Sequence, residues 1–269
     1  MSVTYPLGFR AGGIQAGLRT TPGLDLALIV NDGPADVVAG VFTTNRVCAA
    51  PVQWSRHATA DHKARAVIVN AAVANACTGI DGFAACDITF SRVDSDACMS
   101  TNDTVVAMAS GASGISLTGD ELTDALTELC AILARQLVAD AEGSHHDVKV
   151  TVTGAISTEA AVAVAREVTR SNLVKTAIAG NDPNWGRILA AIGCVPENVA
   201  PFDPDQVDVS INDIQICKAG GIGEDRNLVD MRPREVHIDI ELHAGDAEAA
   251  VWTNDLTHQY VEENSAYTS

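Results

Sequence analysis

Aromatic and basic side chains are both scarce in this sequence. Aromatic residues make up 4% of its 269 residues and hydrophobic residues 47%, so a large core has to be built mainly from aliphatic side chains and alanine. Lys and Arg number 17 against 35 Asp and Glu, which gives a formal net charge of −18. Because nucleic-acid binding depends on Lys and Arg that neutralise phosphates, we expect no nucleic-acid partner, and the same charge works against binding to anionic membranes.

Signals for export, membrane insertion and metal binding are also missing. The first eight residues have neither the basic start nor the apolar run of a secretory signal. Apolar runs such as residues 24–30 are far shorter than the roughly 20 residues that span a bilayer. The seven cysteines include no C-x-x-C pair, which disfavours a zinc site, a redox dithiol or a disulfide framework. We therefore expect a cytoplasmic protein that holds no metal.

The amino-terminal part reads as short strands broken by Gly and Pro. Residues 24–30 form a strand that ends at the turn Asn31-Asp32-Gly33-Pro34, and residues 37–42 form a second one. Residues 66–70 are continuously apolar and β-branched before Asn70, which predicts a central strand of a sheet.

Helices are expected in the middle of the chain. The polar run Ser100 to Thr104 resembles a helix cap, so residues 105–109 are predicted to be helical and to end before Gly111. Thr118 and Glu121 have capping-box spacing and open a longer helix that runs out at residues 139–143. Its buried face is predicted from leucines that recur at helical spacing: Leu122, Leu126, Leu129, Leu133 and Leu137.

The carboxy-terminal half combines helices with a further set of strands. A strand at residues 148–152 precedes one long helical pattern from Thr158 to about Ile178, and Pro183 then sits in the first turn of a helix through Ala191. Four alternating segments follow, which predict an antiparallel sheet half-covered by these helices: 207–211, 214–217, 236–242 and 247–253. The whole is a mixed α/β (α+β) fold with helices layered on mixed and antiparallel sheets.

The segment from Asp140 to Asp147 is rich in side chains that bind ions. Glu142 follows a helix C-terminus, where a carboxylate is unfavourable unless a positive group meets it. That group is either the ammonium of a bound substrate or a neighbouring Lys or Arg. A metal site of His145, His146 and Asp147 is disfavoured, because adjacent side chains on a strand point to opposite faces.

Two other segments have both a structural and a functional interpretation. The loop from Gly180 to Arg187 either connects two helices or borders a site, since it holds several Asx residues and a Trp. The tail from Tyr260 to Ser269 either frays or docks through its aromatic residues and helps to bind a cationic amino group. A serine-nucleophile elbow and a phosphate-binding glycine loop are both absent from the sequence.

Several segments follow one another in the order of the motifs of a known family: 8–11, 24–33, 40–47, 74–79, 100–105, 140–143, 173–177, 181–187 and 261–269. Together they resemble the ornithine acetyltransferase (ArgJ) family. The resemblance implies an ArgJ-like fold and transfer of acetyl from N-acetylornithine to glutamate through an acetyl-threonine, with acetyl-CoA as an alternative donor in bifunctional members and no bound cofactor. It also implies that Glu142, Asn264 and Ser269 hold the amino-acid part of the substrate.

The chain departs from the family pattern in its middle. The lysine- and glycine-rich segment that leads to Met-Ala-Thr and the self-cleavage point, the Ser-Thr-Gly oxyanion loop and the Thr-Thr-Asp element are all absent. Residues 82–85 match early family sequence, whereas residues 87–92 match sequence well beyond the cut, so roughly a third of a family chain is missing. Residues 1–85 are thus interpreted as part of the family's first chain and residues 86–269 as part of its second, with no catalytic residue assigned.

Three functional readings follow from these observations. The first is the family's glutamate N-acetyltransferase, which needs an activated nucleophile and donors for the oxyanion. The second is a non-catalytic remnant or partner subunit that retains partial amino-acid binding, either as a homo-oligomer or in association with an intact homologue. The third is a metal hydrolase that uses the residues from His145 to Asp147.

Overall fold

The computed structural model describes residues 2–16, 23–70, 88–96 and 100–266. The chain divides into two compact units. The first contains Met1–Thr89 and Met99–Cys130, and the second contains Phe90–Cys98 and Ala131–Ser269. Every helix in the described residues is too short or too polar to cross a bilayer.

A six-stranded sheet organises the second unit, in the order β11-β6-β10-β7-β8-β9. Neighbouring strands are antiparallel except β6 and β10, which are parallel. The antiparallel set predicted for the last four strands is therefore wrong at its end. The strands predicted at 236–242 and 247–253 do not pair with each other, because the strand at 147–155 inserts between them. The strands are β6 (Asp147–Ala155), β7 (Asp208–Ile211), β8 (Ile214–Lys218), β9 (Gly221–Ile222), β10 (Glu235–Glu241) and β11 (Ala247–Asn254).

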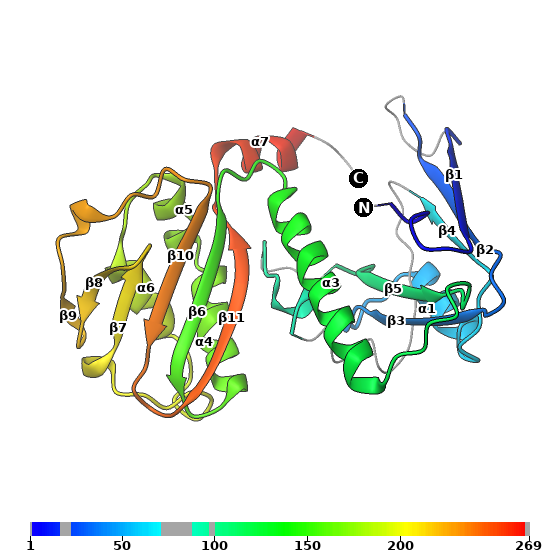
Figure 1. The fold of residues 1–269 in the computed structure, drawn as a ribbon. Helices are drawn as coiled ribbons and strands as arrows, with labels where there is room; N and C mark the ends of the chain where they lie inside the picture. The colour runs from blue at the N-terminus through cyan, green and yellow to red at the C-terminus, as the bar shows by residue number, and fades with distance from the viewer. Residues whose placement is uncertain (1, 17–22, 71–87, 97–99, 267–269) are drawn as a thin grey trace. The chain divides into compact units, whose positions relative to one another are not determined.

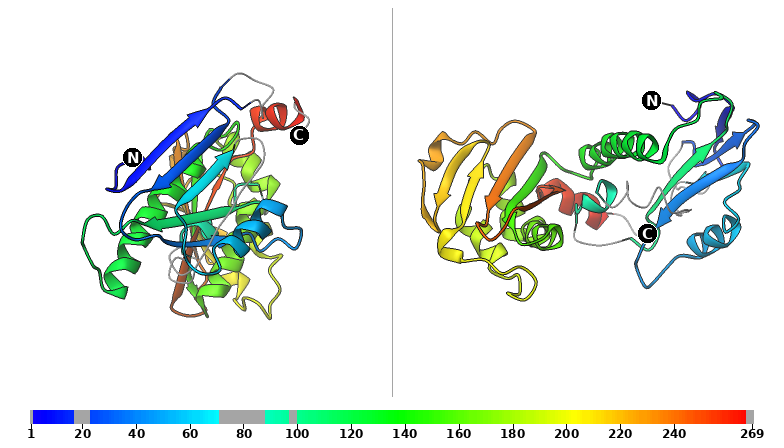
Figure 2. Two further views of the ribbon diagram at one scale, coloured as in Figure 1. Left: turned by 90° about the vertical axis from the view of Figure 1, so that its right-hand side faces the viewer. Right: turned by 60° about the horizontal axis from the view of Figure 1, so that its bottom comes forward.

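Three helices cover one face of this sheet: α4 (Thr158–Arg170), α5 (Asn172–Ala179) and α6 (Trp185–Ile192). Figure 1 draws them behind the sheet, and the turned views of Figure 2 keep them on one side of it. Valine, isoleucine and alanine dominate the core between these layers, as the shortage of aromatic residues predicts. The mixed α/β fold class is confirmed.

The helices between residues 158 and 192 begin at polar N-cap residues, which the pattern of apolar residues did not reveal. The single helix predicted from Thr158 to Ile178 is two helices, because Ser171 adopts an extended backbone and its side chain accepts a hydrogen bond from Val174 N. Pro183 precedes α6 instead of lying in its first turn, since Asn184 is the N-cap and accepts from Arg187 N. The other short elements of this unit are η1 (Phe90–Arg92), η2 (Pro204–Gln206), η3 (Arg226–Leu228) and α7 (His258–Ala266).

The first unit contains two small antiparallel sheets. Strands β1 (Phe9–Ile14), β2 (Leu26–Asn31) and β4 (Ala66–Asn70) form one, and β3 (Val37–Phe42) pairs with β5 (Thr104–Ala109) in the other. A short helix, α1 (Ala50–Ala58), lies between β3 and β4 in sequence. The strands predicted at 24–30, 37–42 and 66–70 are confirmed, the first with its bounds shifted by a residue or two.

Two predictions in the first unit are wrong. Residues 104–109 form the strand β5 and not a helix, because Thr104, Val105 and Val106 are β-branched and the segment pairs with β3 along its whole length. The polar side chains before it close a turn: Asp103 accepts a hydrogen bond from Ser100 N at 3.1 Å. The strand β4 is not central, since among the described strands it pairs only with β2 and lies at the sheet edge.

Helix α3 (Gly119–Ala139) begins as predicted, whereas its buried face differs. Thr118 Oγ1 accepts from Glu121 N at 3.3 Å and Glu121 Oε2 accepts from Thr118 N at 2.8 Å, so the capping box is confirmed. The buried positions are Cys130, Ala134 and Val138, not the predicted leucine stripe. Among the described residues, four of those five leucines keep large exposed fractions: Leu122, Leu129, Leu133 and Leu137.

Candidate functional site

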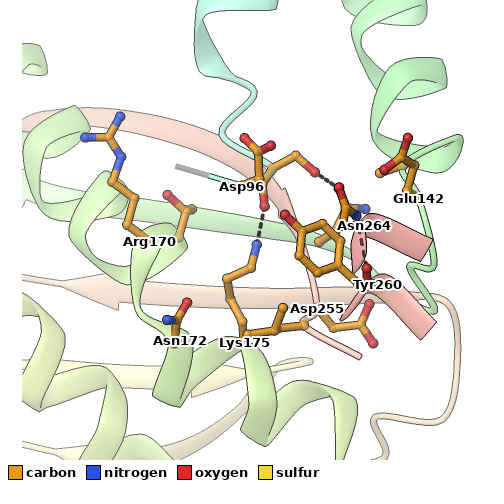
Figure 3. Close-up of a pocket in the computed structure, with 13 residues that line it drawn as sticks. Asp96, Glu142, Arg170, Asn172, Lys175, Asp255, Tyr260 and Asn264 are labelled. Carbon is orange, nitrogen blue, oxygen red and sulfur yellow. Dashed lines mark hydrogen bonds between the residues drawn. The ribbon is translucent and has the colours of Figure 1, made fainter. Parts of the chain in front are cut away.

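A cavity of about 390 Å³ lies within the second unit. Five separate segments meet around it: the loop after α3, the junction of α4 and α5, residues 95–96, the loop after β11, and α7 (Figure 3). Its lining is mainly polar and charged, so it offers hydrogen-bond donors and acceptors to a small hydrophilic molecule. The lining residues are Ser95, Asp96, Ala141, Glu142, Thr169, Arg170, Asn172, Lys175, Asn254, Asp255, Leu256, Tyr260 and Asn264.

Glu142 is held at the cavity by a close contact between its loop and α7. Gly143 has a φ of +62°, and a Cβ added there would lie 2.3 Å from the main-chain nitrogen of Tyr260. Thr257 Oγ1 donates to the Gly143 carbonyl at 2.6 Å and accepts from Tyr260 N at 3.0 Å. The glycine thus lets the first turn of α7 approach the loop, and the threonine fastens the two together.

Asn264 lies one helical turn after Tyr260 on α7. Its side-chain nitrogen donates to the Tyr260 carbonyl at 3.0 Å, and its side-chain oxygen is a hydrogen-bond acceptor. Figure 3 shows Glu142 and Asn264 on the same side of the cavity. A carboxylate and an amide oxygen in the lining of one cavity suit a ligand with an ammonium group.

The wall formed by residues 93–96 is attached to the end of β11. Asp94 N donates to the Trp252 carbonyl at 2.8 Å, and Thr253 Oγ1 donates to the Asp94 carbonyl at 2.6 Å. The Asp94 carboxylate pairs with Arg170 Nε at 2.7 Å, and the Ser95 hydroxyl bonds to the side-chain oxygen of the buried Asn254. These bonds hold residues 94 and 95 against the rest of the second unit, so that Asp96 lies at the edge of the cavity.

Lys175 is a buried cation at the base of the cavity, with 6% of its surface exposed. Its ammonium donates to Thr253 Oγ1 at 2.9 Å and to the Ser95 carbonyl. Burial lowers the pKa of Lys175 to about 8, against the opposing attraction of Asp94, Asp255 and Asp96. Its charge therefore changes within the pH range in which enzymes are usually studied.

Asp255 ties the cavity to the start of β6. One carboxylate oxygen accepts from the main-chain nitrogens of His145 and His146 at 2.9 and 3.0 Å, and the other meets His146 Nδ1 at 2.8 Å. The second ring nitrogen of His146 lies 2.9 Å from the Met231 carbonyl. Because both ring nitrogens have protein partners, neither is open to a metal. In the part of the chain that the structure describes, no three His, Cys, Asp or Glu side chains gather as metal ligands.

The structure brings together two of the three predicted substrate contacts. Glu142 and Asn264 line the same cavity, and Ser269 lies outside the described residues, as do residues 72–73, 82–85 and 97–99. Within the described residues, no Lys or Arg pairs with the Glu142 carboxylate. The ammonium of a bound ligand therefore remains one of the two positive groups expected beside Glu142.

Several residues of the loop from Gly180 to Arg187 make contacts that connect helices. Asp182 pairs with Arg226 at 3.0 Å, Asn184 caps α6, and Arg187 donates to the Leu173 carbonyl at 2.7 Å. Its residues do not line the described cavity. The helix-connection reading accounts for these contacts.

Sequence reasoning missed most of the cavity lining. Lys175 stands in the apolar side of a helical pattern, next to Val174 and before Ala177 and Ile178, and a lysine there is a signal for a buried, partnered cation. Asp96, Arg170, Asn172 and Asp255 carry no comparable signal, because only the fold brings their segments together.

Comparison with models of known protein families covers nearly the whole chain. A model of the ArgJ family matches residues 10–89 and 84–269. The chain belongs to the ArgJ family. The resemblance read from its motifs is confirmed, and the two matched stretches of this ArgJ-family chain include all but its first nine residues.

Individual relatives agree with this assignment. The arginine biosynthesis bifunctional protein ArgJ of Bifidobacterium longum (strain NCC 2705) is 40% identical over 391 aligned positions, covering 100% of both chains. The protein of the same name from Mycobacterium tuberculosis (strain H37Rv) is 33% identical over 392 positions, covering 99% of this chain and 96% of the relative. Both alignments are longer than the 269 residues of this chain, so part of each relative has no counterpart here.

A solved ArgJ structure confirms the fold. The crystal structure of arginine biosynthesis bifunctional protein ArgJ from Bacillus halodurans is 35% identical and superposes with a TM-score of 0.64. The superposition covers 70% of this chain and 91% of that chain. The ArgJ-like fold implied by the resemblance is therefore present.

Proposed function

We propose that this chain binds amino acids of the ornithine type in the cavity around Glu142 and Asn264, without transferring an acetyl group. ArgJ relatives are named for arginine biosynthesis, and acetyl transfer between N-acetylornithine and glutamate is the activity that the family implies. The observation that carries the proposal is the Glu142 carboxylate, which faces a polar cavity without a cationic partner among the described residues. An ammonium group of the ligand supplies that partner.

The expected loss of activity rests on the amino-acid sequence. A threonine hydroxyl becomes a useful nucleophile only when a base takes its proton, and the tetrahedral oxyanion needs aimed donors. The chain contains no Met-Ala-Thr, Ser-Thr-Gly or Thr-Thr-Asp sequence. The two separate family matches, 10–89 and 84–269, support a junction near residue 85 at which the intervening family segment is missing.

The family's acetyltransferase activity is the competing function. Its support is the family itself, since the bifunctional relatives match this chain from end to end. Formation of N-acetylglutamate from glutamate with N-acetylornithine, or with acetyl-CoA as the second donor, decides between the two. A sustained turnover by the purified chain would replace our proposal with the enzyme reading.

Binding is tested by calorimetry with N-acetylornithine, ornithine and glutamate. We expect the wild-type chain to bind N-acetylornithine and Glu142→Gln to bind it roughly tenfold to a hundredfold more weakly, because the variant loses a charge-assisted hydrogen bond. Glu197→Gln is the matched control, since Glu197 is exposed and does not line the cavity. Equal affinities of Glu142→Gln and the wild type would remove the basis for the binding site.

The cellular location and the partners of the chain are also part of the proposal. A role beside arginine biosynthesis places the chain in the cytoplasm, with N-acetylornithine and glutamate as its small-molecule partners. A chain that lacks part of the family fold leaves apolar surface for association. We therefore propose a homo-oligomer or a complex with an intact ArgJ homologue.

A further inference from the structure

Lys175 belongs to the buried side of α5, where its neighbours Val174, Ala177 and Ile178 are apolar. Burying an ammonium group in such a place is costly unless its N–H groups are bonded. Two of its bonds go to neutral acceptors on different segments, the Ser95 carbonyl and Thr253 Oγ1. The side chain therefore joins three segments of the cavity: α5, the end of β11 and the wall at residues 93–96.

The bond to Ser95 has a particular geometric effect. The Ser95 carbonyl belongs to the planar peptide group that leads into Asp96, so a bond to its oxygen fixes the orientation of that whole group. The other bonds of the wall hold Asp94 and the Ser95 hydroxyl. Lys175 is thus a contact that holds the peptide group between Ser95 and Asp96, and Figure 3 shows its amine directed toward that group.

We propose that Lys175 is a positioning residue for the amino-acid site: its ammonium orients the Ser95–Asp96 peptide and so shapes the wall of the cavity that also holds Glu142. The inference rests on the proposed function, because the wall matters only if a ligand enters. Lys175 acts through Ser95 and Asp96 and does not bind the ligand itself, whereas Glu142 binds the ligand's ammonium group.

A pH dependence follows from the charge on Lys175. The groups facing it are Asp94 and Asp96 from the wall, Asp255 from the loop after β11, and, at the cavity, Arg170 and Glu142. Since the pKa of Lys175 lies at about 8, the side chain is charged below that pH and neutral above it. A neutral amine makes weaker hydrogen bonds than an ammonium, so the wall is less firmly held at alkaline pH.

The affinity of the wild-type chain for N-acetylornithine measures this effect. The ligand keeps the charges of its δ-ammonium and carboxylate between pH 7 and 9, so its own titration does not interfere. We expect the affinity to fall by about fivefold or more across this range, with a midpoint near the pKa of Lys175. A rise in affinity would overturn the proposal, because it would mean that Lys175 only repels the ligand's ammonium. A flat profile would overturn it too.

Variants provide the second arm of the test. Lys175→Met should bind N-acetylornithine at least about tenfold more weakly and with no transition near pH 8, since it lacks charge-assisted bonds. Lys218→Met is the matched control, because Lys218 is an exposed lysine at the end of β8. We expect the control to keep both the affinity and the pH profile of the wild type.

Hydrogen–deuterium exchange of the ligand-free chains separates this inference from the proposed function. Lys175→Met should raise the exchange of the peptide containing residues 93–96 several-fold and leave β6 and β10 protected. Unchanged exchange at residues 93–96 would refute the positioning role, whether or not the chain binds an amino acid. If the wild type binds none of the amino acids while exchange rises in Lys175→Met, the proposed function fails and the anchoring role of Lys175 stands.

Discussion

Gly143 controls how closely α7 approaches the loop that carries Glu142. Its left-handed backbone suits glycine, and the main-chain nitrogen of Tyr260 occupies the space that a side chain would need. The residue thus connects a local backbone conformation with the position of two site residues, Glu142 before it and Asn264 further along α7.

Gly143→Ala should displace α7 from the loop. The left-handed conformation alone costs an alanine about 1–2 kcal/mol, and the contact with Tyr260 N adds to it. We expect the affinity for N-acetylornithine to fall at least about tenfold while the circular dichroism of the sheet and helices is retained. Gly119→Ala is the control, because a Cβ there meets nothing within 4 Å. Wild-type affinity in Gly143→Ala would show that ligand binding does not require the close approach of α7 to the loop that carries Glu142.

Residue types alone could identify only part of the site. Glu142 and Asn264 were found because they lie in segments that match the family, and the position of Glu142 after a helix predicted a cationic partner. Asp255 could not be found in this way. Its role depends on three contacts with His145 and His146, which are 109 or 110 residues away in sequence.

Among the elements, α3 shows which features of a helix residues close in sequence determine and which they do not. Its capping box involves residues three apart, and the reciprocal bonds between Thr118 and Glu121 form as the spacing predicts. The Glu121 carboxylate is stabilised by these bonds to Thr118, which lower its pKa. The start of the helix is therefore decided locally, whereas the face that it buries is not.

Removal of the Thr118 side chain tests this local contribution. Thr118→Ala should lower the free energy of unfolding by about 1 kcal/mol, because Glu121 N loses its acceptor at the helix end. Thr118→Ser keeps the hydroxyl and should stay close to the wild type. Urea titrations followed by circular dichroism give both values, and an alanine variant as stable as the serine variant would argue against the capping box.

Strand β5 shows the opposite case. A polar run followed by five apolar residues fits a capped helix as well as a turn before a strand. The outcome depends on β3, which offers six residues for pairing from 62 or more positions earlier in the chain. Pairing over that distance is invisible to a local pattern, so the helix prediction failed here.

At the scale of the whole molecule, the chain divides into two compact units, and the cavity belongs to one of them. The second unit is built from residues 131–269 together with the short segment 90–98. That segment supplies the wall with Asp96, so the site needs a piece of chain that lies apart from the rest of its unit in sequence.

The intact chain should remain uncut. Members of the family that act through threonine free its amino group by cutting the precursor, and no such cleavage sequence remains here. We expect one band at 28.0 kDa on a denaturing gel and by mass spectrometry. Two fragments whose masses sum to that of the chain would contradict the interpretation that the cleavage segment is missing. Light scattering of the same sample reports whether the chain self-associates.

The sequence by itself determined the family, the strands that alternate or are β-branched, the capped helix starts and an aliphatic core, because each depends on residue type and short spacing. Only the tertiary structure decided the strand order, the parallel pairing of β6 with β10, the strand at 104–109 and the gathering of Asp96, Lys175 and Asp255 around one cavity. The physical reason is that these features depend on contacts between segments far apart in the chain, where pairing and burial override local preference.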